Sequence, residues 1–228
     1  MTSFQDVLSP LTAMTSVISQ SQISGELLII DASVDGADQL LAGLRPGVEA
    51  YILHPLEDGV EQISSILRHR RQLSALHILA HGDRGGLRLG NTRLTSQRIR
   101  HDRAQFQLWT NALANNADIL LYGCNVAAGL AGRFFMAELR DATGANVAAS
   151  STLVGHADLG GNWDLDVVVG EVETPLAIAS EARAAYPQTL AANIEASFVG
   201  PTTFGEDVGT ATITVALSAN PDGEVTDQ

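Results

Sequence analysis

Two stretches of this chain, SALHILAHG at residues 74–82 and ADILLYGC at residues 117–124, decide its fold. Each is a nearly continuous apolar run of strand length, and such runs are typical of strands buried on both faces of a parallel sheet. Between them, Gly90-Asn91 predicts a small hairpin, and the amphipathic residues 105–115 predict a helix. Because consecutive strands are usually neighbours in a sheet, we expect these two runs to lie side by side.

The same alternation of apolar runs and amphipathic stretches continues on both sides. It predicts further strands at residues 26–31, 48–54, 145–150 and 162–170, and further helices at residues 35–44, 57–70 and 129–144. Gly144 is expected to close the last of these helices. The repeated strand–helix–strand order predicts an α/β domain over residues 26–172, with a doubly wound, mostly parallel sheet and helices on both faces.

The chain on either side of this domain has a different character. Residues 1–25 are expected to be an N-terminal extension, and the alanine-rich residues 173–193 are expected to be a linker. Residues 194–228 carry threonine-rich alternation, which predicts the first strands of an antiparallel β-sandwich. A sandwich needs about 100 residues, so the sequence predicts that this segment continues into repeat domains of a longer protein.

The composition excludes several classes of function. Hydrophobic residues make up 45% of the 228 residues, which is too many for a disordered chain. The formal net charge of −13 argues against nucleic acid as a partner, and no apolar run is long enough for a membrane span. A single cysteine excludes an internal disulfide and a thiolate zinc cluster.

The basic residues are all arginines, and most of them fall in one window. Residues 68–103 contain nine of the thirteen, with only Asp83 and Asp102 as acids. This window could attract an acidic ligand, but the simpler interpretation is an exposed face balanced by carboxylates from elsewhere in the fold.

The residues capable of chemistry fall where the predicted strands end. Asp31, His54, His81 and Cys124 each end one of four strands, and ligands of doubly wound sheets bind at that edge. A cysteine thiolate attacks carbonyl groups, and a neighbouring histidine can transfer the proton. Gly82 would let a backbone N–H approach the oxyanion, and the helix after Cys124 would lower the pKa of the thiol. The alternative is a small, inert, buried cysteine beside an unrelated histidine.

Other residues are weaker candidates for a functional site. His77 is expected to be a hydrogen-bonded core residue, and His54 to border the cleft, whereas the remaining histidines have no spacing typical of a metal site. No cofactor is expected to be required. Calcium is a possible ligand if the C-terminal segment were a complete repeat, through Glu206, Asp207, Asp222 and Glu224.

LHILAHG, followed 43 residues later by ILLYGC, resembles the signature of caspase-like cysteine peptidases, a superfamily that includes caspases, metacaspases and gingipains. More closely, residues 26–172 resemble the domain of unknown function 4347 of giant bacterial surface proteins. The stretches that carry this likeness are HGDRGGLRLG, ADILLYGCNVAAG, GANVAASSTLVG and GGNWDLDVVVG. The tail, FGEDVGTATITVALS, is similar to the opening strands of a Calx-β repeat, which agrees with the incomplete sandwich.

This resemblance implies a site and a function. Cys124 would be the nucleophile and His81 the general acid and base, with the Gly82 and Cys124 N–H groups forming the oxyanion hole and Gly123 beside them. Asp31 would line a pocket for a basic P1 side chain, although a turn or helix-capping aspartate is an equal alternative. The implied protein is a cysteine endopeptidase module of a secreted or surface adhesin-like protein, acting on a polypeptide, possibly its own. A catalytically inactive scaffold and a carbohydrate-binding module are the alternatives.

Two further expectations concern location and processing. The N-terminus lacks the pattern of a Sec signal peptide, so an extracellular or surface location would require a different route, such as type I secretion. If the P1 pocket is acidic, self-processing is expected after Arg183 in the predicted linker.

Overall fold

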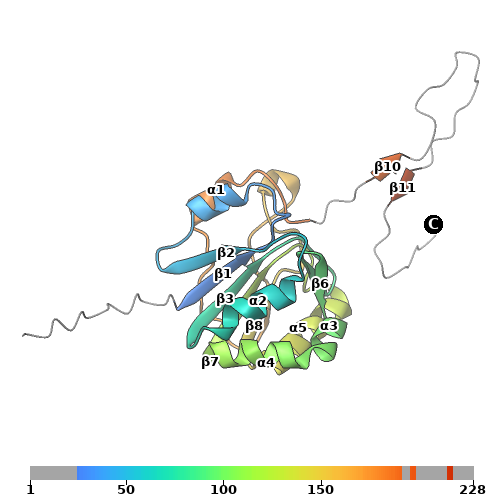
Figure 1. The fold of residues 1–228 in the computed structure, drawn as a ribbon. Coiled ribbons are helices and arrows are strands. Elements are labelled where there is room, and N and C mark those ends of the chain that lie inside the picture. The colour runs from blue at the N-terminus through green and yellow to red at the C-terminus, as the bar shows by residue number, and fades with distance from the viewer. Residues whose placement is uncertain (1–24, 192–195, 199–214, 218–228) are drawn as a thin grey trace, which may run out of the picture.

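A six-stranded sheet forms the centre of the protein in a computed structural model that describes residues 25–191, 196–198 and 215–217 (Figure 1). The strand order is β2-β1-β3-β7-β8-β9, and only β9 runs antiparallel to its neighbour. The strands are β1 (Glu26–Ile30), β2 (Val48–Ile52), β3 (Leu73–Leu79), β7 (Leu113–Tyr122), β8 (Asn146–Ala149) and β9 (Val167–Val169). The predicted α/β fold with a doubly wound, mostly parallel sheet is therefore confirmed.

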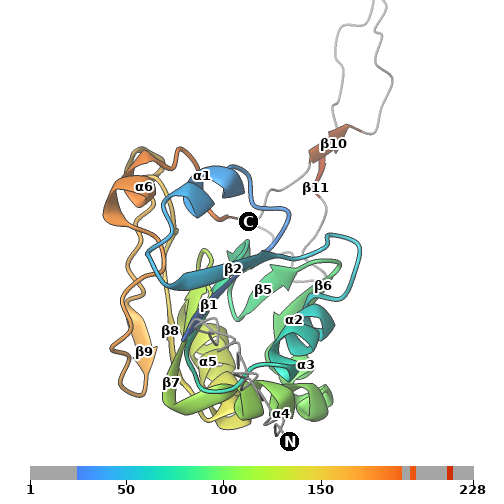
Figure 2. The same ribbon diagram turned by 60° about the vertical axis from the view of Figure 1, so that its left-hand side comes forward.

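Both faces of the sheet are covered, which explains why its strands lack polar alternation. In β1, Leu27 and Ile29 belong to one apolar cluster, whereas Leu28 and Ile30 belong to a second cluster on the opposite face. The first cluster is covered by α2 (Gly59–Arg68), α3 (Ser96–His101), α4 (Arg103–Ala112) and α5 (Gly129–Thr143), and the second by α1 (Ala37–Ala42), α6 (Ser180–Ala185) and the chain around them. Figure 2 shows these two groups of helices on opposite sides of the sheet.

The helix ends follow local sequence signals. The Asp58 side chain accepts hydrogen bonds from the backbone N–H groups of Val60 and Glu61 and so caps the start of α2. As predicted, Gly144 ends α5 with a left-handed backbone, at φ 74°. The helix α3 was missed by the pattern analysis because it is one short turn-and-a-half, set by the cap that the Thr95 hydroxyl forms with Arg98 N–H.

A small antiparallel sheet follows directly after β3. It contains β4 (Gly82–Asp83), β5 (Gly86–Leu89) and β6 (Thr92–Thr95). Leu89 pairs with Thr92, so the predicted hairpin turns at Gly90-Asn91. Gly90 has φ 58°, a backbone conformation that favours glycine. This sheet leads the chain away from the carboxyl end of β3.

The predicted linker at residues 173–193 is different in the structure. Through Ala191 it is packed against the domain, and the side chains of Ala177, Ile178, Tyr186 and Leu190 are buried in the second cluster. The close packing depends on Gly43, where a Cβ would lie 2.0 Å from that of Ala182 in α6. Pattern analysis failed here because the anchoring residues are irregularly spaced and much of the attachment is through backbone groups.

The N-terminal extension through residue 24 and the candidate calcium ligands lie outside the described residues. In the C-terminal segment, β10 (Ala196–Phe198) and β11 (Val215–Leu217) pair antiparallel, with Phe198 opposite Val215. A single 3-10 turn (Ala157–Leu159) lies between β8 and β9. Within the described ranges, no helix is both long and apolar enough to cross a membrane.

Candidate functional site

The strand ends that carry His81 and Cys124 lie beside each other, as the sequence suggested. The strands β3 and β7 are adjacent, and their last registered pair is Leu79 with Tyr122. His81 and Cys124 are each two residues beyond that pair. The backbone N–H of Ala80 donates to the carbonyl of Tyr122 at 3.0 Å, so the pairing continues to the edge of the site.

Glycines allow the two backbones to touch at this edge. A Cβ on Gly82 would lie 2.9 Å from the carbonyl oxygen of Cys124 and 2.9 Å from the carbonyl carbon of Gly123. A Cβ on Gly123 would lie 2.5 Å from the Leu87 side chain. All three distances are shorter than a Cβ tolerates, so a side chain at Gly82 would separate the strand ends and one at Gly123 would displace Leu87. Gly82 and Gly123 thus have a steric role at the site.

His81 is buried and is held by one of its two ring nitrogens. Its Nε2–H donates to the backbone carbonyl of Ser33 at 3.0 Å, which leaves Nδ1 as the unprotonated nitrogen of the neutral ring. Nδ1 is buried and has no hydrogen-bond partner among the described residues. Buried polar atoms are normally paired, so an unpaired ring nitrogen at the end of a strand is a feature that requires a functional explanation.

Asp31 supports His81 indirectly. Its Oδ1 accepts from the backbone N–H of Ser33 at 3.0 Å and from the Ser33 hydroxyl, and its Oδ2 accepts from Gly90 N–H. This is the turn role that the sequence left open, with the carboxylate buried. The Ser33 carbonyl that the turn fixes is the acceptor of His81 Nε2–H.

Cys124 is completely buried. The backbone N–H of Val154 donates to its Sγ at 3.2 Å, and Sγ lies 3.6 Å from the Val154 carbonyl oxygen. Burial raises the pKa of the thiol, although hydrogen bonds from Val154 and Leu190 act in the opposite direction. The expected lowering by the following helix is therefore wrong: α5 begins five residues later, at Gly129, and desolvation dominates.

The group that covers Cys124 is the chain's own segment 187–191. The backbone N–H of Leu190 donates to the Val154 carbonyl at 2.8 Å, and His156 N–H donates to the Gln188 carbonyl at 2.8 Å. These bonds flank an antiparallel bridge between Gly155 and Thr189. The segment is thus paired with residues 154–156 through the bridge at Thr189.

The carbonyl of Leu190 occupies the position that the sequence analysis assigned to an oxyanion. Its oxygen accepts from the Gly82 N–H at 3.2 Å and from the Cys124 N–H at 3.5 Å. Sequence reasoning missed Val154, Gly155 and Leu190 altogether. Among these three residues, Gly155 is the one whose residue type reflects its role, because a Cβ there would lie 2.2 Å from the Gln188 carbonyl oxygen.

His77 is a core residue, as predicted, and takes no part in this cleft. Its Nδ1 accepts from the Tyr122 hydroxyl at 2.9 Å, and its Nε2 lies 3.3 Å from the Glu26 carboxylate. The Tyr122 oxygen also accepts from the Ala177 N–H at 2.9 Å. Burial lowers the pKa of His77, whereas its hydrogen bond lowers the pKa of Glu26.

Four of the nine arginines of the window form ion pairs with described residues, three of them with a carboxylate from outside the window, which agrees in part with the simpler interpretation. Arg70 binds Glu49 at 2.5 Å and also contacts the Tyr51 hydroxyl and ring. Further pairs are Arg93 with Asp83, Arg98 with Asp58 and Asp102, and Arg100 with Glu138. In the part of the chain that the structure describes, no group of three or more His, Cys, Asp or Glu residues could hold a metal ion.

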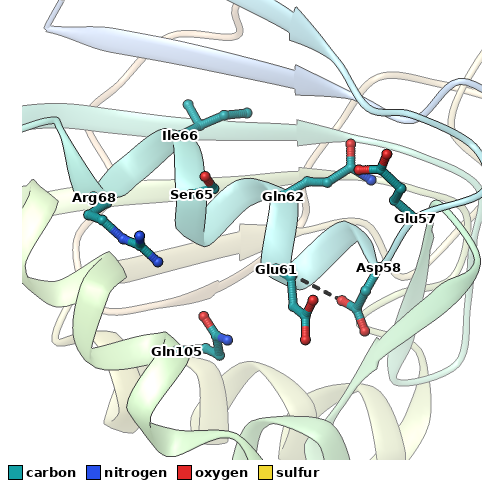
Figure 3. A pocket seen from close by; sticks show the side chains of 8 residues that line it. All are labelled: Glu57, Asp58, Glu61, Gln62, Ser65, Ile66, Arg68 and Gln105. Carbon is teal, nitrogen blue, oxygen red and sulfur yellow. Dashed lines mark hydrogen bonds between the residues drawn. The ribbon is translucent and has the colours of Figure 1, made fainter.

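Surface hollows lie away from the cleft. One is lined by residues of α2 and by Gln105 of α4, with Glu57, Asp58 and Glu61 gathered near the start of α2 and Arg68 near its end (Figure 3). A second, around Asp118, adjoins the amino ends of β3, β7 and β8. His54 follows β2 and is exposed, and its backbone N–H and carbonyl are hydrogen-bonded to the Gln62 side chain. None of these groups contacts Cys124 or His81.

Comparison with protein-family models gives a match over most of the chain. The model of a family described as a domain of unknown function (DUF4347) matches residues 27–190. This range extends through the predicted linker and ends at Leu190, the residue whose carbonyl lies in the cleft. No curated protein matches the chain significantly.

Proposed function

We propose that this chain, which belongs to the DUF4347 family of domains of unknown function, is a cysteine endopeptidase that uses Cys124 and His81. One observation carries the proposal. A single peptide carbonyl, that of Leu190, accepts from the two N–H groups of Gly82 and Cys124 at the end of adjacent strands. Two convergent backbone donors on one carbonyl oxygen, with a cysteine beside them, are what acyl transfer to sulfur requires.

The residues would act in sequence on a bound peptide. The Sγ–H proton of Cys124 passes to His81 Nδ1, and Sγ forms a bond to the carbonyl carbon. The oxygen then carries the negative charge between the N–H groups of Gly82 and Cys124. Collapse breaks the C–N bond, and His81 returns the proton to the leaving amine. Water hydrolyses the thioester with His81 as base, which yields a carboxylate and restores the thiol.

The ring geometry of His81 supports this role. Because Nε2–H is held by the Ser33 carbonyl, Nδ1 is free to accept a proton, and the ring cannot turn without losing that bond. Asp31 fixes Ser33 and so positions His81. The proposal requires the Nδ1 atom of His81 to face Cys124.

The wider setting that we propose rests on the sequence resemblance. The strand order, with an antiparallel strand at one edge, is compatible with a caspase-like fold. The tail's likeness to a Calx-β repeat supports a place within a secreted or surface adhesin-like protein of bacteria, reached by a route other than Sec.

A second candidate function has its own supporting observation. The buried sulfur and the covered cleft also suit an inactive relative that serves as a scaffold or recognition module. The two proposals differ in whether Cys124 reacts as an activated nucleophile once a peptide can enter.

Peptidyl acyloxymethyl ketones separate these candidates. We would treat the wild-type chain, Tyr186→Ala, which removes a buried anchor of the covering segment, and their His81→Ala counterparts with three such reagents, bearing Arg, Leu or Asp at P1, and map the modified residue by mass spectrometry. An active peptidase gives a stoichiometric adduct on Cys124 in at least one of the first two proteins, at a rate at least 100-fold lower when His81 is replaced. If the thiol reacts only after denaturation, or equally fast without His81, the peptidase proposal is wrong.

A further inference from the structure

The segment that covers the cleft is bound as a substrate would be. Residues 187–191 form an antiparallel bridge to Gly155 through Thr189 and a parallel bridge to Gly82 through Ala191, with a bend at Gln188. Addition of an extended strand is a common way for proteins to hold a peptide, because backbone hydrogen bonds fix its register. The register here places one particular peptide bond beside Cys124.

That bond is the one between Leu190 and Ala191. The Leu190 N–H is bound by the Val154 carbonyl, and its carbonyl oxygen is bound by Gly82 and Cys124. Among the described residues, Leu190 is the one whose carbonyl receives both of these N–H groups. We infer that the enzyme's substrate is its own chain and that it cleaves after Leu190, an inference that rests on the proposed peptidase function.

The position of the Leu190 side chain indicates the specificity. It is fully buried in the second apolar cluster, which also contains Cys124, Val154 and Tyr186. A P1 side chain held in such surroundings must be apolar, because an unpaired charge there would be strongly disfavoured. The Asp31 carboxylate, which would have favoured arginine at P1, is instead bound by Ser33 and Gly90.

The chain on the amino side of the bond is anchored. Tyr186 is buried, and its hydroxyl donates to the Asp35 carbonyl at 2.9 Å. Anchors at Tyr186 and Leu190 hold the intervening residues across the cleft, so the reacting bond is presented within the molecule without an entropic cost of association. Gly155 is the matching feature of the cleft, because any side chain there would collide with Gln188.

The same geometry disfavours cleavage after Arg183. Arg183 lies within the helix α6, and its carbonyl accepts from the Trp163 indole N–H at 3.1 Å. A helical backbone cannot form the strand pairing that places a carbonyl between Gly82 and Cys124. Residue 183 therefore lies elsewhere in the fold. After cleavage at Leu190 it would stay with the amino-terminal product.

In the cleavage, Cys124 Sγ replaces the nitrogen of Ala191 on the carbonyl carbon of Leu190. The proton from the thiol leaves with the amine of Ala191 through His81. One water molecule then converts the thioester to a carboxylate on Leu190 and restores the thiol. The products are residues 1–190 and 191–228, and the only co-reactant is water.

The test is prolonged incubation of the full chain at neutral pH, with and without calcium, followed by intact-mass analysis and sequencing of any new amino terminus. We expect a new terminus at Ala191 that is absent from Cys124→Ala. Ala191→Pro keeps Leu190 in the extended region that precedes proline while replacing the scissile amide, and should abolish the cut. Arg183→Ala should be cut at the wild-type rate.

A second measurement does not depend on the buried segment. On Tyr186→Ala, which removes an anchor of the covering segment and leaves Gly155 unchanged, an acyloxymethyl ketone carrying Pro-Gln-Thr-Leu should label Cys124 at least tenfold faster than one carrying Pro-Gln-Thr-Arg. If cleavage depends on Cys124 but occurs elsewhere, or if the arginine reagent is preferred, the assignment of Leu190 is wrong and the peptidase proposal stands. Reagent labelling without any self-cleavage also overturns the assignment. If no P1 type labels Cys124 in the native protein, the peptidase proposal fails as well.

Discussion

Gly155 lies so close to Gln188 that a Cβ on the glycine would be 2.2 Å from the Gln188 carbonyl oxygen. The cleft beside Cys124 is therefore shaped for a backbone and not for a side chain. Gly155 also has φ 135°, a conformation that residues with side chains rarely adopt. Two independent constraints thus fix glycine at the point where the chain's own segment crosses the site.

The first prediction follows from this contact. Gly155→Ala should displace residues 187–191, because the new methyl group and the Gln188 carbonyl cannot occupy the same space. We expect iodoacetamide to modify Cys124 at least tenfold faster than in the wild-type chain, and hydrogen exchange of the Leu190 amide to accelerate. The free energy of unfolding should fall by about 1–3 kcal/mol.

Gly160→Ala is the matched control for this experiment. Gly160 also has a positive φ, 78°, but a Cβ there would meet only the Leu153 side chain, at 4.0 Å. It should introduce the smaller strain of a left-handed residue without displacing the segment. Equal acceleration of Cys124 modification in both variants would show that strain, and not the contact with Gln188, controls access.

A second prediction separates two roles for Asp31. If Asp31 positions His81 through Ser33, Asp31→Asn should slow labelling of Cys124 by peptidyl ketones about tenfold, within the range of general acid–base effects. The ratio of rates for leucine and arginine reagents should not change. Loss of a preference for the arginine reagent would instead place Asp31 in the P1 pocket.

A third prediction concerns the network beneath the site. Tyr122→Phe removes the hydroxyl that donates to His77 and accepts from the Ala177 N–H, and so leaves two buried polar groups unpaired. The free energy of unfolding should fall by about 1–3 kcal/mol. The control is Tyr51→Phe, because the Tyr51 hydroxyl is exposed and contacts Arg70. It should cost less than about 0.5 kcal/mol. If urea denaturation gives similar losses of unfolding free energy for the two variants, the network around Tyr122 does not stabilise the fold.

A fourth prediction is a pH dependence with a defined sign. Burial lowers the pKa of His77 in the folded chain, so below about pH 6.5 the unfolded chain binds a proton that the folded chain does not. The free energy of unfolding should therefore be greatest above that pH and should fall as the pH decreases toward the folded-state pKa. The lowered pKa of Glu26 adds a further loss below its usual value of 4.5.

The measurement is urea denaturation between pH 7.5 and 5.0. His77→Gln should flatten the decline between pH 6.5 and 5.0, because glutamine binds no proton. A decline of the same steepness in that variant would assign the pH dependence to other groups.

The sequence by itself determined the sheet and two members of the site. Continuous apolar runs are sufficient to identify strands buried on both faces, and the end of each run places His81 and Cys124 at one edge. Gly144 and the Gly90-Asn91 turn were readable because their backbone conformations select particular residue types. These features are local, so a single stretch of chain contains their cause.

Only the tertiary structure decided what lies in the cleft. Residues 187–191 are held by backbone groups of Gly82, Cys124 and residues 154–156, and a backbone contact leaves almost no trace in side-chain pattern. The pKa of Cys124 likewise depends on burial within the fold, which raises it, and on backbone groups at Val154 and Leu190, which are distant along the chain. The sequence specifies Cys124 and His81 at neighbouring strand ends, but the segment that lies against them is defined by contacts between parts of the chain that are distant in sequence.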